Sequence, residues 1–379
     1  MVATFKVNFY LKRAICSSRS SSTLHEINYK FSVDFILKHQ TRLIRWDFEL
    51  LKAQRQRAQS LYNNILNIGG YLTKLRSALS TKEKLVVPIG SCVNGLRNRN
   101  SDLDIVLVTS HQEAKQSAFN SRFRNDIHFR RTQMDIIANI LKKKKLADVN
   151  SIQQLILSNV PILKFRSCDG INVDLQFNNI PSIRSTAFVK TCVEFSAVVP
   201  ITIHWINSFF EVVKLKDSRH GLFSSYHLNM LALHFLQAAP LSLLPDMISF
   251  YPHLLPTVPW QNVADFLTTE NSKEYAVDYT SLLHHISAAE VIVRMVDYYS
   301  QLDLFNFAIN TTGKCYPRET EDERSTFIQL DDPYFADYSP ASSRCNVQNS
   351  SYIVQQTFSA LKSELECGNL QKLFRIYPF

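Results

Sequence analysis

Several features that mark secreted, zinc-bound and membrane-spanning proteins are missing from this 379-residue sequence. The seven cysteines are odd in number and none form a Cys-x-x-Cys pair, which argues against a disulfide framework and a structural zinc site. We therefore expect a reducing compartment. No stretch of about 18 residues is apolar without polar interruption, so the sequence predicts no membrane span. Internal repeats and glycine- or proline-rich linkers are also missing.

Acidic residues are missing from the first 25 positions, which hold four basic residues and a serine-rich patch. This composition is typical of a mitochondrial presequence, but the apolar residues do not share one helical face. We expect a cytoplasmic protein, with a mitochondrial location as the alternative.

Over the whole chain, 42 basic and 33 acidic residues give a formal charge of +9. This surplus favours a polyanionic partner, although a basic protein without a nucleic-acid role has the same balance.

Hydrophobic periodicity divides the chain into helical and strand-forming parts. Apolar residues from 47 to 79 recur at helical steps, and Gly69-Gly70 is predicted to divide this run into two helices. The stretches "KLVVPIGS" and "DLDIVLV" predict two strands separated by a short turn-rich segment. The stretch "VPILKFRSCDGINVDLQF" predicts a hairpin with its turn at Asp169-Gly170. After about residue 185 the pattern is mostly helical, with one more helix near 352–365.

Two carboxylates lie at the start of an apolar strand. Asp102 and Asp104 are two residues apart, so they share a face of the predicted strand, while their apolar neighbours face a core. Like charges repel unless a cation lies between them, and oxygen-only ligands suit Mg²⁺ or Mn²⁺. Asp174, a lone acid on the polar face of the hairpin, is the natural third ligand. The alternative is a structural pair of aspartates that caps the chain or binds Arg97 or Arg99.

A glycine and a serine precede these aspartates by about a dozen residues. Gly90 lets the backbone approach a phosphate, and Ser91 offers a hydroxyl and an amide as donors. The pair alone is weak evidence. The order of a strand, Gly-Ser, a spacer, Asp-x-Asp on a second strand and an isolated Asp on a third is much more specific.

These motifs together resemble a known family. The stretch "GSCVNGLRNRNSDLDIVLV" is similar to the signature of the DNA polymerase β-type nucleotidyltransferases, and more narrowly of the noncanonical poly(A) polymerases and terminal uridylyltransferases. The resemblance continues through "VPILKFRSCDGINVDLQFNN", "HGLFSSYHLNMLALHFLQ", "AAEVIVRMVDYYSQLDLFNF" and "IQLDDPY", over roughly residues 45 to 366. It looks closest to the cytoplasmic germline-type poly(A) polymerases.

The resemblance implies an α+β fold. A polymerase β-like nucleotidyltransferase domain, a small mixed sheet with flanking helices, would pack on a mainly helical poly(A)-polymerase-associated domain. The expected segments are a basic tail that is disordered or a targeting segment (1–29), a helical segment of the central domain (30–75), the catalytic domain (76–185) and the helical central domain (186–379). A nucleotide-recognition loop is expected near 328–346.

The activity implied by the resemblance is template-independent extension of an RNA 3′ end, most simply with AMP from ATP. Two-metal phosphoryl transfer would use Asp102 and Asp104 on both ions and Asp174 on the ion that activates the RNA hydroxyl. Gly90 and Ser91 would cradle the β- and γ-phosphates. The other expected nucleotide contacts are Asn94 in the same loop, Thr186 and Ser225 at the ribose and phosphates, Tyr226 stacked on the base, and Asp332 at the base edge.

The sequence departs from this family at two places. Ile203 stands where the family usually has a lysine that contacts the triphosphate, and Asn207 stands where a second basic residue often follows one turn later. Losing these cations weakens binding of a polyanion unless Lys214 or Lys216 replaces them, so a catalytically silent RNA- or protein-binding relative stays an alternative.

Uridylyltransferases carry a histidine after the Asp-Pro motif, where an ungapped comparison puts Tyr338. This favours ATP, with a uridylyltransferase or mixed-tail enzyme as the alternative.

No RNA-recognition module accompanies the expected catalytic unit. The only dense basic run is Lys142 to Lys145, which also fits a solvated helix C-terminus, where the helix dipole favours lysine. The expected partners are therefore an RNA 3′ end, a nucleoside triphosphate and an RNA-binding protein that selects the target, with no membrane.

Overall fold

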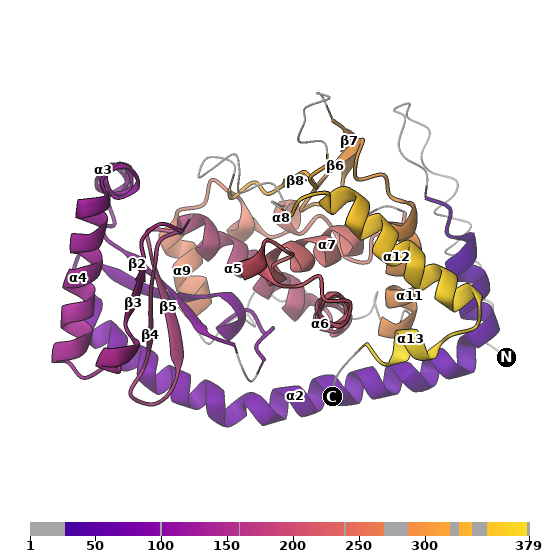
Figure 1. Cartoon of the computed structure of the whole chain (residues 1–379), viewed down its shortest axis with the longest axis horizontal. Helices are drawn as coiled ribbons and strands as arrows, with labels where there is room; N and C mark the ends of the chain where they lie inside the picture. Colours follow the sequence, from indigo (N-terminus) through magenta and orange to yellow (C-terminus); the bar gives the residue numbers. More distant parts are fainter. Residues whose placement is uncertain are drawn as a thin grey trace. The chain divides into compact units, whose positions relative to one another are not determined.

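The computed structural model divides the chain into two compact units, shown in Figure 1. It describes residues 27–98, 101–158, 160–238, 240–268, 287–318, 326–335 and 347–376. We call the unit of residues Gln54–Phe195 and Tyr251–Asp278 the sheet unit. The helical unit consists of Met1–Ala53, Ser196–Phe250 and Tyr279–Phe379. The basic tail lies outside the described residues up to position 26.

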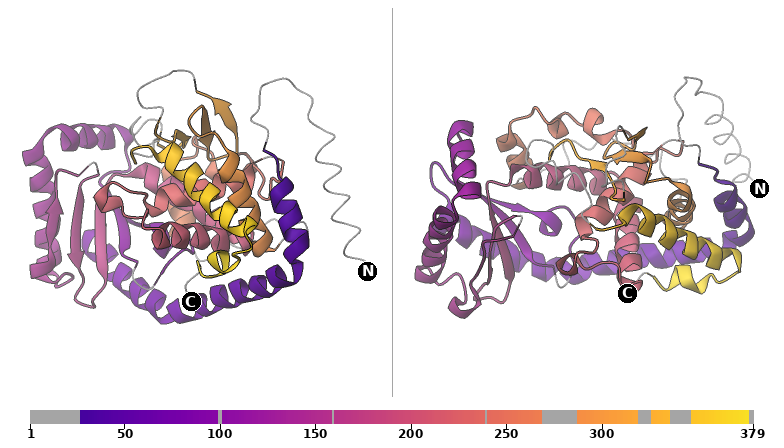
Figure 2. Two further views of the ribbon diagram at one scale, coloured as in Figure 1. Left: turned by 45° about the vertical axis from the view of Figure 1, so that its right-hand side comes forward. Right: turned by 45° about the horizontal axis from the view of Figure 1, so that its top comes forward.

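The sheet unit is built on one mixed five-stranded sheet, whose strands lie side by side in both views of Figure 2. In spatial order the strands are β1 (Leu85–Ile89), β2 (Leu103–Val108), β5 (Asn172–Phe177), β4 (Ile162–Arg166) and β3 (Gln153–Leu155). The central pair β2 and β5 is parallel, and every other pair is antiparallel. The predicted hairpin is confirmed as β4 and β5.

Helices cover the apolar face of this sheet. Helices α3 (Glu113–Asn125) and α4 (Ile127–Lys143) lie on that face, whereas α5 (Ile180–Phe195) and α9 (Trp260–Thr268) contact β1 and each other. Short turns are η1 (Gly90–Cys92), η2 (Val149–Ser151) and η4 (Pro252–Leu254). Helix α4 begins where the side chain of Asp126 accepts a hydrogen bond from the Phe129 amide. Its buried Leu141 shares the core with Leu163 and Leu175 of the sheet. The opposite face carries polar side chains such as Asp104, Asp174 and Lys164, beside the buried Val106 and Val108 of β2.

The long helix α2 (Lys30–Leu79) runs without a break through Gly69 and Gly70, so the prediction of two helices divided there is wrong. Each glycine costs an exposed helix only about 1 kcal/mol. Tyr71 and Leu75 on the following turns are buried in the core of the sheet unit, and this packing outweighs the cost. The one residue with non-helical dihedral angles inside α2 is His39.

The helical unit has its own core and a small sheet that the sequence patterns did not predict. Its helices are α6 (Val198–Val212), η3 (Ser218–His220), α7 (Ser225–Gln237), α8 (Met247–Phe250), α11 (Ala288–Gln301), α12 (Ser350–Glu366) and α13 (Gln371–Phe374). The three-stranded sheet has the order β7 (Cys315–Pro317), β6 (Phe307–Asn310) and β8 (Leu330–Asp331). Helix α12 confirms the helix predicted near residues 352–365. No single helix among the described residues is long and apolar enough to cross a bilayer, although α5 and α6 reach that length and composition as a bent pair.

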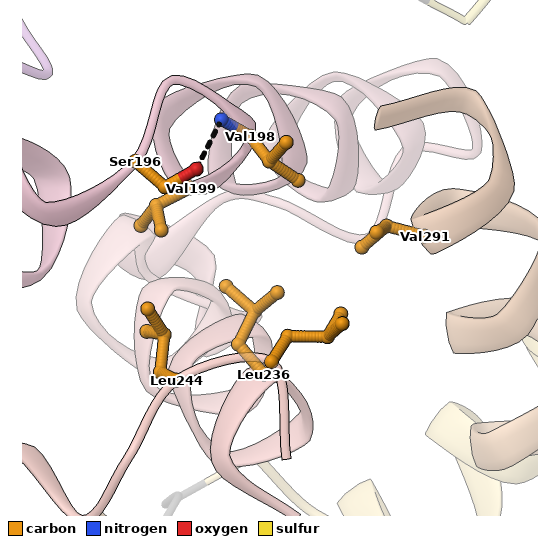
Figure 3. A pocket seen from close by; sticks show the side chains of 7 residues that line it. Ser196, Val198, Val199, Leu236, Leu244 and Val291 are labelled. Carbon is orange, nitrogen blue, oxygen red and sulfur yellow. Dashed lines mark hydrogen bonds between the residues drawn. The ribbon is translucent and has the colours of Figure 1, made fainter. Parts of the chain in front are cut away.

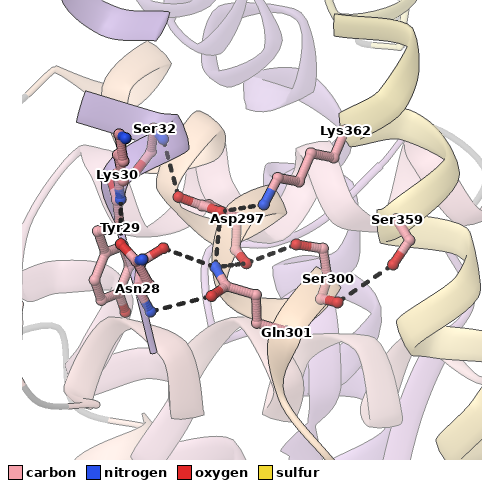
Figure 4. Close-up of polar contacts among 9 residues, drawn as sticks. All are labelled: Asn28, Tyr29, Lys30, Ser32, Asp297, Ser300, Gln301, Ser359 and Lys362. Carbon is pink, nitrogen blue, oxygen red and sulfur yellow. Dashed lines mark hydrogen bonds and ion pairs between the residues drawn. The ribbon is translucent and has the colours of Figure 1, made fainter. Parts of the chain in front are cut away.

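A buried carboxylate joins three segments of the helical unit, as Figure 4 shows. Asp297 of α11 is fully buried. Its carboxylate accepts hydrogen bonds from the Ser32 amide at 2.9 Å, from Lys362 Nζ at 2.9 Å and from Gln301 Nε2 at 2.8 Å. The start of α2 and the middle of α12 are therefore both tied to α11 through one fully paired charge.

Candidate active site

The three predicted aspartates meet on the polar face of the sheet unit. Strands β2 and β5 run parallel with Asp104 directly opposite Asp174. Asp102 immediately precedes β2 and lies two residues from Asp104, so it projects from the same face. The buried alternation of β5 supports this register, because a slip by one residue would turn the apolar side chains of β5 out of the core.

The surroundings of Asp104 disfavour its charge. Burial, followed by the negative charges of Asp174 and Asp102, raises the pKa of the Asp104 carboxyl to about 7. The nearby cations Lys164 and Arg97 lower it, but they do not compensate. A carboxylate this strained by like charge is a candidate functional group, because a bound cation would relieve the strain.

Lys164 is a component of this site that the sequence analysis missed. Its Nζ lies 3.1 Å from Asp102 Oδ2 and 3.0 Å from Asp174 Oδ1, because Lys164 stands opposite Asp174 in the β4–β5 hairpin. Burial alone would lower the pKa of this ammonium, but the hydrogen bonds and charges of the two aspartates outweigh burial and raise it. A two-residue turn at Asp169-Gly170 would place Phe165 opposite Asp174, but the loop has three residues, 168–170, and this brings Lys164 there instead.

The donor set fits a hard divalent cation. It consists of carboxylate oxygens, and the buried Asp174 Oδ1 accepts no well-directed hydrogen bond although the Lys164 ammonium is near. Across the described part of the chain, no three His, Cys, Asp or Glu side chains are arranged to hold one ion together. Asp102 and Asp174 can share a cation only after the Lys164 ammonium leaves them, so the lysine and the ion compete.

The predicted phosphate loop lies against the aspartates. Gly90 has a φ of +68°, and a β-carbon there would lie 2.8 Å from Asp104 Oδ2, so only glycine fits. Its amide donates to Thr186 Oγ1 at 3.0 Å. Thr186 is buried, so it holds the backbone of the loop from the protein interior. Asn94 is buried too, and its side chain accepts from the Leu96 amide, whereas Ser91 is partly exposed within η1.

Pairing of the aspartates with Arg97 is not found. The Arg97 guanidinium donates to Asn64 Oδ1 at 2.9 Å, to the Ser101 carbonyl at 3.0 Å and to Cys92 Sγ. In the described residues it forms no ion pair with Asp102 or Asp104, and Arg99 lies outside them. The interpretation of the two aspartates as an Arg97 pair is therefore wrong.

In the helical unit, two residues predicted to contact the base are brought together. The Tyr226 hydroxyl donates to Asp332 Oδ2 at 2.6 Å, across 106 positions of sequence. Asp332 Oδ1 accepts from the Tyr334 amide at 2.8 Å, and the Phe335 ring packs edge-on to Tyr226 at 5.6 Å. Burial raises the pKa of both Asp332 and Tyr226. The rest of the expected recognition loop, including Tyr338, lies outside the described residues.

The positions of the missing family lysines carry no cation. Ile203 is buried in α6, and Asn207 is buried with its Nδ2 donating to the Ile203 carbonyl and to Asn229. Of the two possible replacements, Lys214 is exposed, whereas Lys216 lines a cavity of about 340 Å³ together with Ser225. Burial lowers the pKa of Lys216.

A second cavity, drawn in Figure 3, is lined almost entirely by apolar side chains that can neither catalyse a reaction nor bind a charged ligand. It lies within the helical unit among valines and leucines of α6, α7 and α11, such as Val199, Leu236 and Val291. Its one polar group, Ser196 Oγ, accepts from the Val198 amide at 3.3 Å. With about 10 Å³ it has room for at most about one water, so it is a packing defect.

Comparison with known proteins finds poly(A) polymerases that are similar in sequence and fold. Residues 47–194 match the family model described as poly(A) RNA polymerase, mitochondrial-like, central palm domain. Poly(A) RNA polymerase gld-2 of Caenorhabditis elegans is 28% identical over 239 residues, which cover 60% of this chain and 20% of the relative. Poly(A) RNA polymerase GLD2 of Xenopus tropicalis is 26% identical over 252 residues, which cover 65% and 44%. The chain thus spans less than half the length of these curated relatives.

Solved structures share the fold, which confirms the predicted fold class. A chain of the GLD-2/RNP-8 complex gives a TM-score of 0.65 at 20% identity and covers 88% of this chain and 98% of its own length. Cid1 poly(U) polymerase gives 0.58 at 15% identity, with 86% and 98% covered. The structure of mtPAP in complex with UTP gives 0.56 at 16% identity, with 98% and 75% covered. In fold the chain is therefore similar to these polymerases, and in sequence its residues 47–194 match the central palm domain of the mitochondrial-like poly(A) RNA polymerases.

Proposed function

We propose that this chain is a template-independent RNA 3′-terminal nucleotidyltransferase that adds AMP from ATP. The observation that carries the proposal is the cluster of three aspartates beside the Gly90 loop. Asp104 stands in register with Asp174, and its pKa is raised to about 7 by burial and by its two acidic neighbours. We assign catalysis to residues 76–185, and the helical central domain to residues 30–75 and 186–379.

Each residue of the cluster has a separate task in this mechanism. Asp102, Asp104 and Asp174 would hold Mg²⁺ or Mn²⁺, which supplies charge neutralisation and a lowered pKa for the attacking RNA hydroxyl. The Gly90 amide region brings backbone close to phosphate oxygens, with Ser91 as a further donor. Lys164 keeps Asp102 and Asp174 compensated until a cation replaces its ammonium.

The proposed base contacts are Tyr226 and Asp332. The hydrogen bond between them fixes the orientation of the tyrosine ring, so that its face can stack on a base. Asp332 keeps lone pairs for an exocyclic amino group such as that of adenine, directly or through water. Ser225 and Lys216 line one cavity and are proposed to meet the phosphates. UTP or mixed nucleotide use is the alternative for this part of the proposal.

Partners and location are proposed from the similar proteins. GLD-2 has been solved with RNP-8 and with GLD-3, and the chain described here resembles GLD-2 in fold. We therefore propose that an RNA-binding protein selects the RNA target of this chain. A cytoplasmic location is proposed from the poly(A) polymerase relatives, with the mitochondrion as the alternative from the mitochondrial-like family model.

The test is tail addition to an oligoribonucleotide with Mg²⁺ or Mn²⁺ and each nucleoside triphosphate in turn. We expect extension with ATP and much less with the other three. Extension with UTP would make the chain a uridylyltransferase. No extension with any nucleotide, even with cell extract that supplies partners, would contradict the proposal.

A silent binding module is the competing function, favoured by the apolar Ile203 and the neutral Asn207. A melting experiment separates the two functions. A chain that binds ATP gains RT ln(1 + [L]/Kd) in stability, so its melting temperature rises with ATP and Mg²⁺. A silent relative without a nucleotide site melts at the same temperature with and without them.

A further inference from the structure

A basic surface lies where α4 ends beside the tip of the β4–β5 hairpin. We call it the tip patch and define it by its exposed basic residues, which are Lys74, Lys142, Lys143, Lys144, Lys145 and Arg166. The segments that carry it are fixed to one another by hydrogen bonds. The Cys168 thiol donates to the Lys145 carbonyl at 3.2 Å, the Asp148 amide to the Arg166 carbonyl at 2.8 Å, and the Tyr71 hydroxyl to the Leu146 carbonyl at 2.8 Å.

The positive charges of this patch are poorly compensated. In the described part of the chain, neither the four lysines nor Arg166 forms an ion pair. The two acids nearby are both engaged, since Asp169 pairs with Lys74 at 3.4 Å and Asp148 caps η2 by accepting from the Asn150 amide. An uncompensated cationic surface attracts a polyanion.

The hydrogen bonds that close the C-terminus of α4 do not involve the side chains of these lysines. The amides of Lys144, Lys145 and Leu146 satisfy the last carbonyls of α4, at 2.9, 3.1 and 2.9 Å. Lys145 itself has a φ of +54°, a conformation in which glycine or asparagine is favoured. A charged side chain is therefore held at a strained position that a smaller residue would fill better, which points to a use for the charge.

Arg166 connects the tip patch to the aspartates. It lies two residues beyond Lys164 on β4, so both side chains leave the same face, roughly 7 Å apart along the strand. A chain of phosphates that starts at the carboxylate cluster can pass Arg166 before it reaches the lysines.

We propose that the tip patch binds the sugar-phosphate backbone of the RNA substrate upstream of its 3′ end. This assignment rests on the proposed function. The patch recognises phosphates by charge and reads no sequence, so it adds affinity for any single strand long enough to reach it. Target choice is left to other contacts.

The first experiment measures RNA binding without nucleotide, by fluorescence anisotropy, on the full chain. The variant is Lys142→Gln, Lys143→Gln, Lys144→Gln and Lys145→Gln combined. Its matched control removes the same charge from exposed positions of α2, by changing Lys38, Arg42, Arg45 and Lys52 to Gln. For an RNA of about 15 nucleotides we expect at least about tenfold weaker binding in the patch variant, and little change for one of about 4 nucleotides. The salt dependence of binding should weaken, with a slope smaller by about 0.7 for each phosphate that the variant no longer neutralises.

Equal losses in the patch variant and the α2 control, or an unchanged dissociation constant for the long RNA, overturn the proposal. Lys145→Gly provides a second discrimination. It should raise the melting temperature, because glycine relieves the left-handed conformation, and still weaken long-RNA binding. A higher melting temperature with unchanged RNA binding makes the lysines a solvated helix end only. Since no nucleotide is present, normal RNA binding without tail addition would sink the proposed function and leave the patch standing.

Discussion

Two aspartates, one in each unit, show opposite ways of placing a carboxylate in this protein. Asp297 in the helical unit is fully buried and fully paired, with Lys362, Gln301 and a backbone amide as donors. Asp104 in the sheet unit faces two other acids, and its pKa is raised to about 7 by burial and then by those acids. Compensated burial of a charge indicates a structural role, whereas uncompensated burial indicates that a ligand completes the site.

The largest effect is expected from Asp104→Ala. Nucleotide transfer should fall by about 10³-fold or more, because the carboxylate between the other two acids is lost. The melting temperature of the metal-free protein should hold or rise, because like-charge repulsion is removed. Tail addition and melting are measured on one preparation. A variant that still adds tails, or that is inactive only because it unfolds, would refute the metal-site interpretation.

Asp297→Ala should instead lower the stability of the fold. Its free energy of unfolding should fall by about 3–5 kcal/mol, because the Lys362 ammonium and the Ser32 amide lose their buried acceptor. Urea unfolding measures the change. Ser359→Ala serves as the control, since its hydroxyl only donates to the Ser300 carbonyl at 3.3 Å in the same network. A loss for Asp297→Ala no larger than that of the control would show that the network is not structural.

The stability of the metal-free protein should depend on pH through Asp104. Its pKa when folded, about 7, is above the ordinary aspartate value of 3.8, so folding is favoured while the group is protonated. This contribution is complete below about pH 4 and is lost as the pH rises through 7, for a total of roughly 2–4 kcal/mol. Asp104→Asn should melt above the unchanged chain at pH 8, and this gap should close toward pH 5. A gap that does not change with pH would remove Asp104 as its source.

Lys164→Met tests the difference between Lys164, which pairs with Asp102 and Asp174, and Lys362, which pairs with Asp297. Because Lys164 is partly exposed, we expect only about 1 kcal/mol of lost stability without metal. Mg²⁺ binding, measured by calorimetry, should become several-fold tighter, because the ammonium no longer competes for Asp102 and Asp174. Lys164→Arg keeps the charge and should bind Mg²⁺ like the unchanged chain. Weaker Mg²⁺ binding by Lys164→Met would mean that the lysine assists the ion.

Local patterns were sufficient for much of the fold and for the elements that carry the cluster. The apolar run in "DLDIVLV" and the alternation in the hairpin gave β2, β4 and β5, and the turn at Asp169-Gly170 gave the position of the hairpin. The register of the hairpin was not predicted, because the loop has three residues, 168–170, and therefore pairs Lys164 rather than Phe165 with Asp174. The helix break at Gly69-Gly70 was predicted wrongly, because glycine propensity is weak beside the buried packing of Tyr71 and Leu75.

The sequence by itself determined which side chains can bear charge on the polar face of each strand, because side-chain direction alternates with period two. Only the tertiary structure decided which charges find partners. Asp297 meets residues 265 positions earlier and 65 later, and Tyr226 meets Asp332 across 106 positions. No local rule links such residues, since burial and neighbouring charges come from packing of distant segments. The same packing leaves Asp104 without compensation and raises its pKa to about 7.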